Sequence, residues 1–465
     1  MRFSVIMFST ALLLSAAALT QAADRLAPAS WNLESSPGMS KLPTISVPGI
    51  DAQVAREQDK TSFLPGQPLQ RAAPRQSRLD VIAGAQVREL ADGRKIARLR
   101  IQADGATDLN LAFSRFHMPE GAMLHIYDEQ RSVFQGPWDS RQNRDHGEFW
   151  SPVVPGDVAI VEVVWSGAQP VLRLDQVFVG FRDLFAREGG PYVSKSHGAC
   201  NIDVVCPEGD SWRDEIRSVV RIQVGGGVCS GTLINDAGQT NTPWILTADH
   251  CGIDANAAAS VVVYWNFEAA NCGDQQANLT DNQSGSALAA TRFDVDMTLL
   301  KLDAAPQESF NVHFAGWTID DTPPPGAVGI HHPSGDVKSI SFAGDPLVAE
   351  PSCIASGGPD GTHWWVSKWD EGTTEPGSSG SAIFHPDSKQ VVGFLSGGSA
   401  ACSVPLGGDC YGRFDVGWDG ANAASRLRDH LDPDGLISPG GGVAGVDPGE
   451  GSSGDILFAD RFEST

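Results

Sequence analysis

Eight cysteines, all between positions 200 and 410 of the 465-residue chain, constrain its fold more than any other feature of the sequence. An even number of cysteines in an exported protein predicts disulfide bonds, and these eight permit on the order of a hundred pairings. None of them forms a CxxC pair, so a structural zinc site is not expected. The second half of the chain is therefore expected to be cross-linked, and the half before it contains no cysteine.

The first residues have the pattern of an export signal. A positive start, Met1-Arg2, precedes an apolar run from Val5 to Leu19, and Ala22 and Ala23 offer small residues for cleavage. This pattern predicts a signal peptide over residues 1–23 that is removed from the mature protein. No later stretch approaches the ~20 apolar residues of a membrane helix, so we expect a secreted, extracellular protein without a membrane partner.

Composition narrows the class of protein further. Hydrophobic residues make up 41% of the chain, which is enough for a sizeable core. The net charge of −24 argues against a nucleic-acid partner, because phosphate would be repelled and no basic stripe is present. We expect no metal ion and no cofactor.

Changes in composition and in the pattern of strand and turn residues divide the chain into segments. Residues 24 to about 75 are rich in Pro, Ala, Ser and Gln and predict an extended or poorly ordered arm. From about 79 to 185, short alternating strands separated by turn residues predict a β-sandwich. Gly189-Gly190-Pro191 marks the break before a second strand-rich domain over residues 196–434.

The end of the second domain has a different pattern. Residues 421–431 predict a helix, because Ala424, Leu427 and Leu431 fall on one face and Pro433 follows. Residues 435–465 then predict a Gly/Pro-rich linker and a C-terminal tail.

Three segments of the second domain suggest nucleophilic catalysis. His250 ends an apolar strand beside Cys251, Asp296 begins an apolar run, and Ser379 lies between Gly377 and Gly380. Each segment alone is weak, but serine needs an adjacent base, histidine can be that base near neutral pH, and a buried carboxylate can orient it. The order His, Asp, Ser resembles that of chymotrypsin-like proteases, and the separations between these residues are long enough to place His and Asp on one barrel and Ser on the other.

These segments resemble a known family. Cys229-Ser230-Gly231-Thr232-Leu233-Ile234 and Leu246-Thr247-Ala248-Asp249-His250-Cys251 look like the first barrel of chymotrypsin-like proteases. The match to bacterial lysyl endopeptidases covers nearly all of residues 200–433. Its motifs are Cys200-Asn201-Ile202-Asp203-Val204-Val205-Cys206-Pro207-Glu208-Gly209-Asp210, Val262-Val263-Tyr264-Trp265-Asn266, Ile330-His331-His332-Pro333, Thr374-Glu375-Pro376-Gly377-Ser378-Ser379-Gly380-Ser381 and Asp409-Cys410-Tyr411-Gly412-Arg413.

The resemblance implies an all-β, chymotrypsin-like double barrel with a C-terminal helix, preceded by a β-sandwich-like propeptide. It implies that Ser379 is the nucleophile, His250 the base and then the acid, and Asp296 the orienting carboxylate, with Asp294 as the rival. The backbone N–H groups of Gly377 and Ser379 would form the oxyanion hole.

The resemblance also assigns the specificity pocket. Asp409 would pair with a substrate lysine, because a carboxylate in a closed pocket gains a charge-assisted bond with an ammonium group. Trp369 would line the substrate cleft. The family has a histidine where this chain has Ser396, so the stacking of that histidine on the tryptophan is lost.

The family pattern implies three disulfides, Cys200–Cys402, Cys206–Cys272 and Cys229–Cys251, and Cys353–Cys410 is left by elimination. It also implies a zymogen, with residues 24–195 as propeptide and cleavage between Lys195 and Ser196. The β-rich propeptide domain would assist folding and inhibit the enzyme, or it would be retained as a binding domain.

The leading hypothesis is a secreted, monomeric serine endopeptidase that cleaves protein or peptide substrates after lysine through an acyl-enzyme. Trypsin-like cleavage after Arg and Lys is the alternative within this class, and a non-catalytic binding module is the alternative outside it. His331-His332 suggests metal binding, but adjacent side chains on an extended chain point to opposite sides, which favours a structural role.

Overall fold

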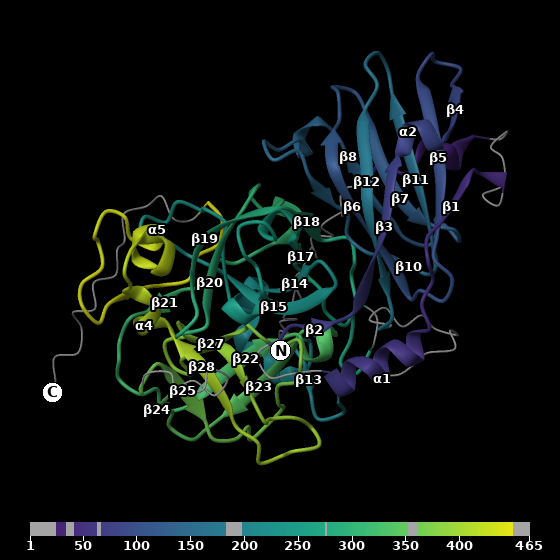
Figure 1. The fold of residues 1–465 in the computed structure, drawn as a ribbon. Helices are drawn as coiled ribbons and strands as arrows, with labels where there is room; N and C mark the ends of the chain where they lie inside the picture. Colours follow the sequence, from purple (N-terminus) through teal and green to yellow (C-terminus); the bar gives the residue numbers. More distant parts are fainter. Residues whose placement is uncertain are drawn as a thin grey trace, which may run out of the picture.

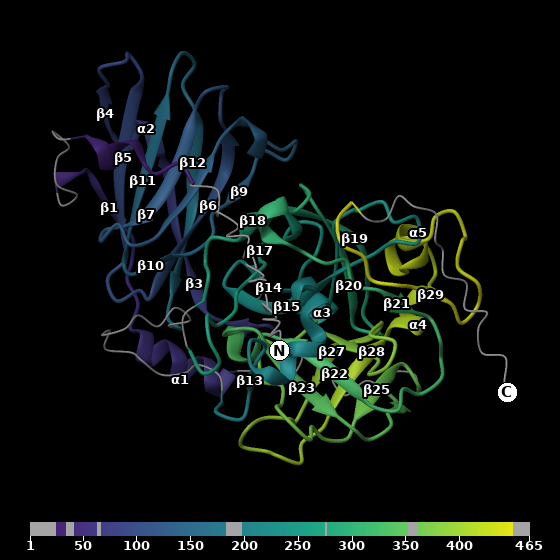
Figure 2. The ribbon, with the colours of Figure 1, turned by 180° about the vertical axis from the view of Figure 1, so that it is seen from behind.

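The chain folds into an N-terminal β-sandwich and a pair of β-barrels, arranged side by side in Figures 1 and 2. This computed structural model describes residues 25–33, 41–62, 67–182, 198–274, 277–351 and 360–449. Among these residues, no helix is both long enough and apolar enough to cross a membrane.

The sandwich consists of two mainly antiparallel sheets. The first sheet has the order β1-β5-β11-β7-β8, with β4 paired to β5, and the second has the order β10-β6-β12-β3, with β9 paired to β6. The strands of the first sheet are β1 (Thr44–Ser46), β4 (Gln86–Glu89), β5 (Lys95–Gln102), β7 (Met123–Asp128), β8 (Phe134–Trp138) and β11 (Val158–Trp165). Those of the second are β3 (Ala72–Asp80), β6 (Asp108–His117), β9 (Phe149–Trp150), β10 (Val154–Pro155) and β12 (Val171–Gly180).

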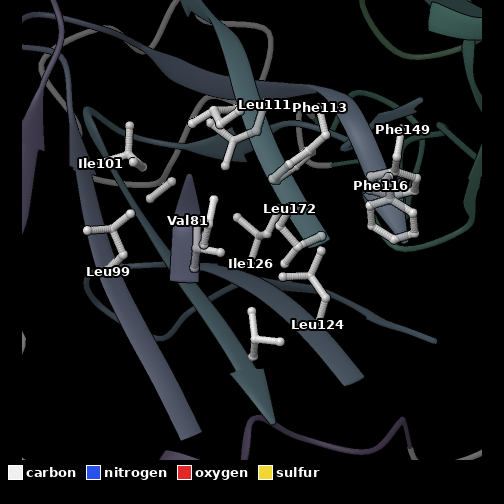
Figure 3. Packing of buried hydrophobic residues seen from close by; sticks show 14 of the residues in the cluster. Val81, Leu99, Ile101, Leu111, Phe113, Phe116, Leu124, Ile126, Phe149 and Leu172 are labelled. Carbon is white, nitrogen blue, oxygen red and sulfur yellow. The ribbon is translucent and has the colours of Figure 1, made fainter. Parts of the chain in front are cut away.

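One apolar core holds the two sheets of the sandwich together. The strands are rich in β-branched and aromatic residues, which pack well on a pleated surface. Figure 3 shows this packing for Val81, Leu99, Ile101, Leu111, Phe113, Phe116, Leu124, Ile126, Phe149 and Leu172. The sandwich predicted from strand texture is therefore present.

The segment predicted as an extended arm is more ordered than expected. It forms β1, α1 (Ala52–Ser62), β2 (Leu69–Gln70) and the beginning of β3, so the sandwich takes in residues well before position 79. The prediction was wrong here because β1 pairs with β5 in parallel, and such a distant partner leaves no trace in local composition.

The second domain contains two curled sheets, which confirm the expected all-β double barrel. The first barrel has the strand order β18-β17-β14-β15-β16-β20-β19. These strands are β14 (Val219–Val224), β15 (Gly227–Ile234), β16 (Trp244–Thr247), β17 (Val262–Tyr264), β18 (Asn282–Ser284), β19 (Ser286–Arg292) and β20 (Met297–Leu302).

The second barrel has the order β13-β23-β22-β26-β27-β28-β25-β24, and β21 pairs with both β27 and β29. Its strands are β13 (Ile202–Asp203), β21 (Trp317–Thr318), β22 (Ala327–His331), β23 (Ser339–Ala343), β24 (Val348–Glu350), β25 (His363–Val366), β26 (Ala382–Phe384), β27 (Val391–Gly398), β28 (Asp409–Arg413) and β29 (Gly442–Val443).

Helices are short in the second domain. They are α3 (Arg213–Ser218), α4 (Phe414–Trp418) and α5 (Arg428–Leu431). The helix predicted over residues 421–431 is reduced to α5 and a 3-10 turn over Ala423–Ser425. A different backbone conformation interrupts the predicted helix, because Arg426 between these two pieces is extended.

Part of the predicted linker is also ordered. Gly442 pairs with Thr318, and Phe314 exchanges backbone hydrogen bonds with Val446. The Asp447 carboxylate accepts a hydrogen bond from His313 Nδ1 at 2.8 Å and pairs with Arg217 at 2.9 Å. The prediction of a flexible linker from position 435 was therefore wrong for residues 442–447, which bind the barrels through backbone pairing that a Gly-rich sequence allows.

The sandwich and the first barrel are in direct contact. Strand β2 pairs with β15, and a small apolar cluster combines Val153 of the sandwich with Val262, Tyr264 and Phe267 of the barrel. The backbone N–H of Val153 donates to the Tyr264 hydroxyl at 2.9 Å. The two units are therefore joined by a packed interface as well as by the chain.

Candidate active site

His250 and Asp296 form the centre of the candidate active site. His250 lies in a 3-10 turn (Asp249–Cys251) directly after β16. Its ring Nδ1 donates to Asp296 Oδ2 at 2.7 Å, and its backbone N–H donates to Asp296 Oδ1 at 2.8 Å. Both side chains are almost completely buried. Because the carboxylate can only accept, it fixes the ring with its proton on Nδ1 and leaves Nε2 free to act as a base.

The backbone of Asp296 supports the same arrangement. The residue has φ of +59° in the turn between β19 and β20, a conformation that few residues other than glycine adopt. Its carbonyl also accepts the N–H of Asp249 at 3.1 Å. The rival carboxylate, Asp294, instead makes two hydrogen bonds of 2.7 Å with Arg292, and those bonds lower the pKa of Asp294. The structure thus brings His250 together with Asp296.

The loop that carries Ser379 packs against the first barrel. The Ser379 carbonyl accepts the N–H of Ser230 at 2.8 Å. A Cβ placed on Gly380, which has φ of +80°, would lie 2.1 Å from Thr247 Oγ1 and 2.8 Å from the backbone N of Ala248. Only a glycine allows this approach. The serine is therefore held beside the strand end that leads to His250, although the described residues show no hydrogen bond between the Ser379 hydroxyl and the imidazole.

The backbone N–H groups beside Ser379 fall into two sets, those that donate to a carbonyl and those that do not. Gly377 has φ of +102°, and the N–H groups of Ser378, Gly380 and Ser381 all donate to carbonyls. Across the described residues, the N–H groups of Gly377 and Ser379 have no such acceptor. These are the two donors that an oxyanion hole would use, because they can turn toward the oxygen of a tetrahedral intermediate.

Asp409 is a buried carboxylate at the beginning of β28. Its Oδ2 accepts hydrogen bonds from Trp369 Nε1 at 2.7 Å and from Thr374 Oγ1 at 2.6 Å. Burial raises the pKa of Asp409 to about 6, and these hydrogen bonds act in the opposite direction. No cation pairs with Asp409 among the described residues, so its charge lacks the partner that a buried carboxylate usually has.

Comparison with known proteins shows which proteins this chain resembles. The model "Lysyl endopeptidase, C-terminal domain" matches residues 194–412, and "Lysyl endopeptidase N-terminal domain" matches residues 47–174. The lysyl endopeptidase of Pseudomonas aeruginosa is 30% identical over 346 residues, which cover 68% of this chain and 71% of that protein. The chain belongs to the lysyl endopeptidase family. It is a serine endopeptidase that acts on proteins or peptides.

Solved structures are more distant from this endopeptidase. The active form of the Rv3671c protease from M. tuberculosis has a TM-score of 0.31 and 15% identity, over 52% of this chain and 96% of that chain. The thermostable serine protease AL20 from an extremophilic microorganism has a TM-score of 0.31 and 12% identity, over 43% and 92%. Likenesses this weak add nothing to the family assignment.

Trp369 and Ser396 of the endopeptidase have different neighbours. Trp369 contacts Asp409 directly, and Ser396 lies on β27, which pairs with β28. The Ser396 hydroxyl contacts His363 Nε2 at 3.0 Å. Burial lowers the pKa of His363 to about 4, so this ring is neutral in neutral solution. Sequence reasoning did not find His363, because it lies on a different strand, β25, and no motif includes it.

Two further residues of the endopeptidase hold the Ser379 loop. The Ser230 hydroxyl donates to the Gly377 carbonyl at 2.9 Å and accepts the N–H of His332 at 3.0 Å. The His331 ring contacts the hydroxyl of Ser378 at 2.8 Å. The His332 ring instead contacts the Asp336 carbonyl through Nδ1 at 2.9 Å, so the two adjacent rings have separate partners, as their alternation along the strand predicts.

Three of the disulfides implied by the resemblance are present: Cys200–Cys402, Cys206–Cys272 and Cys229–Cys251. Cys410 is also disulfide-bonded, but its expected partner Cys353 lies outside the described residues. The expected cleavage site at Lys195 and Ser196 and the signal peptide over residues 1–23 also lie outside them.

Proposed function

We propose that this chain is the zymogen of a secreted endopeptidase that cleaves peptide bonds after lysine. The observation that carries the proposal is the buried carboxylate of Asp409, which accepts hydrogen bonds from Trp369, Thr374 and the Ala400 backbone and pairs with no cation among the described residues. A substrate ammonium would supply the missing charge, whereas an uncharged side chain would leave the carboxylate unpaired.

The reaction follows from the residues around His250. Nε2 of His250 takes the proton of the Ser379 hydroxyl as its oxygen attacks the scissile carbonyl, and the N–H groups of Gly377 and Ser379 stabilise the oxyanion. His250 then protonates the leaving amine, which gives an acyl-enzyme, and repeats both steps with water. Asp296 keeps the ring oriented and stabilises its protonated form.

A peptide panel tests the lysine preference. We expect substrates with Lys before the scissile bond to be cleaved far faster than matched substrates with Arg or Leu. Asp409→Asn should reduce Lys cleavage by at least about 100-fold, because a charge-assisted bond in a closed site is lost. Labelling of Ser379 by a serine-reactive phosphonate should be nearly unchanged in Asp409→Asn and absent in Ser379→Ala. An unaltered Lys preference in Asp409→Asn would show that Asp409 does not recognise the substrate lysine.

The zymogen is the second part of the proposal. The chain contains a lysine, Lys195, after the region that the N-terminal family model matches and at the beginning of the region that the C-terminal model matches. An enzyme specific for lysine can cut there itself. The disulfides fit an oxidising, extracellular location. N-terminal sequencing of the secreted protein should give Ser196 as the first residue, and a beginning well away from Ser196 would rule out self-processing at Lys195.

A further inference from the structure

The N-terminal domain reaches the protease domain with one short strand. Gln70 lies opposite Gly227 and Leu69 opposite Val228, in antiparallel register, so β2 extends the sheet of the first barrel. Two backbone hydrogen bonds continue the contact, since the N–H groups of Arg71 and Ala72 donate to the Gly226 carbonyl at 2.8 and 3.2 Å.

The sandwich in turn holds β2 in place. The Gln70 carbonyl accepts Arg182 Nε at 2.7 Å, and the Arg71 carbonyl accepts the N–H of Phe181 at 2.9 Å. Arg71 is fully buried and pairs with Asp108, which is also fully buried. The strand is therefore fixed to the folded sandwich and is not a loose peptide.

The edge of β15 that β2 covers lies next to the catalytic residues. Val228 precedes Cys229, whose disulfide joins it to Cys251, the residue after His250. Ser230, one position further, donates its N–H to the Ser379 carbonyl. An extended chain on this edge therefore lies beside both His250 and Ser379.

The chemistry decides which part of a substrate would need this edge. In the proposed reaction the lysine side chain enters the Asp409 pocket in the second barrel. His250, in the first barrel, protonates the leaving amine. The residues that follow the scissile bond must then extend along the first barrel, where the Gly227–Val228 edge of β15 can pair with an extended peptide.

We propose that β2 is a built-in inhibitory strand, which occupies the edge of β15 that pairs with the leaving-group side of a substrate. This inference rests on the proposed function for the direction of the substrate. The strand keeps this place after the chain is cut between the domains, because its contacts all lie outside the junction. The enzyme becomes fully active on long substrates only when the N-terminal domain dissociates.

Gly226 offers a selective way to weaken the contact. A Cβ on Gly226 would lie 2.2 Å from the carbonyl oxygen of Ala72, and the three nearest atoms all belong to Gln70 or Ala72. Gly226→Ala therefore clashes with the N-terminal domain and with nothing comparably close in the protease domain. Gly344→Ala is the matched control, because its Cβ would meet only the Asp370 carboxylate at 3.3 Å, in the second barrel.

The experiment uses the full chain with Lys195→Gln, so that the domains stay joined, and checks the intact mass. Two substrates are compared: a short lysyl anilide with no residue after the scissile bond, and a peptide that continues four residues beyond the lysine. We expect Gly226→Ala to raise kcat/KM for the long peptide relative to the anilide by at least about tenfold, and Gly344→Ala to leave this ratio unchanged. An equal ratio in the parent and in folded Gly226→Ala would overturn the proposal.

A binding measurement separates this inference from the catalytic assignment. In a Ser379→Ala background, Gly226→Ala should tighten the Kd of the long peptide by a similar factor and speed amide hydrogen exchange at residues 69–72. Tighter binding without hydrolysis of either substrate by the active chains would refute the proposed reaction and retain the inhibitory strand. Faster exchange at residues 69–72 without tighter binding would refute the inhibitory strand alone.

Discussion

Asp296 and Asp294 are two positions apart and have opposite environments. Asp296 is buried and accepts two hydrogen bonds from His250, whereas Asp294 is partly exposed and pairs with Arg292. We expect Asp296→Asn to lower kcat by about 10⁴-fold, because an amide can impose the wrong tautomer on the imidazole. Asp294→Asn, the matched control, should change kcat less than tenfold. Steady-state kinetics on both variants checks this, and the reverse order would exchange their roles.

The raised pKa of Asp409 predicts a pH-dependent selectivity. As the pH falls through about 6, the carboxyl takes up a proton and can no longer pair with an ammonium group. The ratio of kcat/KM for Lys substrates to kcat/KM for Leu substrates should therefore fall over this range. Because the proposed triad would act on both substrates alike, its own pH dependence cancels in the ratio. The ratio should be flat with pH in Asp409→Asn, and a parent ratio that stays constant from pH 8 to pH 5 would contradict the prediction.

At the scale of elements, the turn after Ser379 requires glycine at position 380, where a side chain would not fit. Gly380→Ala would meet Thr247 and Ala248 and would also strain the backbone at φ of +80°. Gly361→Ala is a matched control, because Gly361 has φ of +78° and nothing within 4 Å of its Cβ. We expect a loss of about 3–5 kcal/mol in unfolding free energy with Gly380→Ala and about 1–2 kcal/mol with Gly361→Ala. Urea denaturation measures both, and equal losses would show that the close approach does not matter.

The residues of the proposed triad could be picked out from the sequence because their signals are local. His250 follows an apolar strand, Asp296 precedes one, and Ser379 lies between glycines, so each can be read within a few residues. The contacts of His363 with Ser396 and of Ser230 with Gly377 join strands that are distant in sequence. No local sequence pattern predicts such pairs, because the strands that carry them come together only in the folded sheets.

Segments with polar or Gly-rich composition were predicted less well. Strand β1 and the ordered residues 442–447 were expected to be irregular, yet both bind through backbone hydrogen bonds. Backbone pairing needs no particular side chain, so composition could not reveal it. The predicted helix failed for the opposite reason, because its apolar spacing was genuine while the chain between its two parts is extended.

At the scale of the whole molecule, the buried pair of Arg71 and Asp108 lies where the two domains meet. Asp108→Asn leaves a buried arginine without its partner, which should destabilise the full chain by about 3–5 kcal/mol. Asp92→Asn removes an exposed pair with Arg94 and should change the unfolding free energy far less, because solvent screens exposed charges. Thermal unfolding in a Ser379→Ala background avoids self-digestion, and similar shifts in Tm for the two variants would contradict the importance of the buried pair.

Ser230 belongs to the first barrel, and the Gly377–Ser379 loop that it grips belongs to the second. The hydroxyl of this single side chain therefore links the two barrels where they meet. Slight separation of the two barrels would release the loop and disrupt the proposed oxyanion hole while every strand stayed intact. The enzyme rate should consequently fall in mild denaturant before the circular dichroism signal changes. The rate would then report on small changes in the relative position of the two barrels.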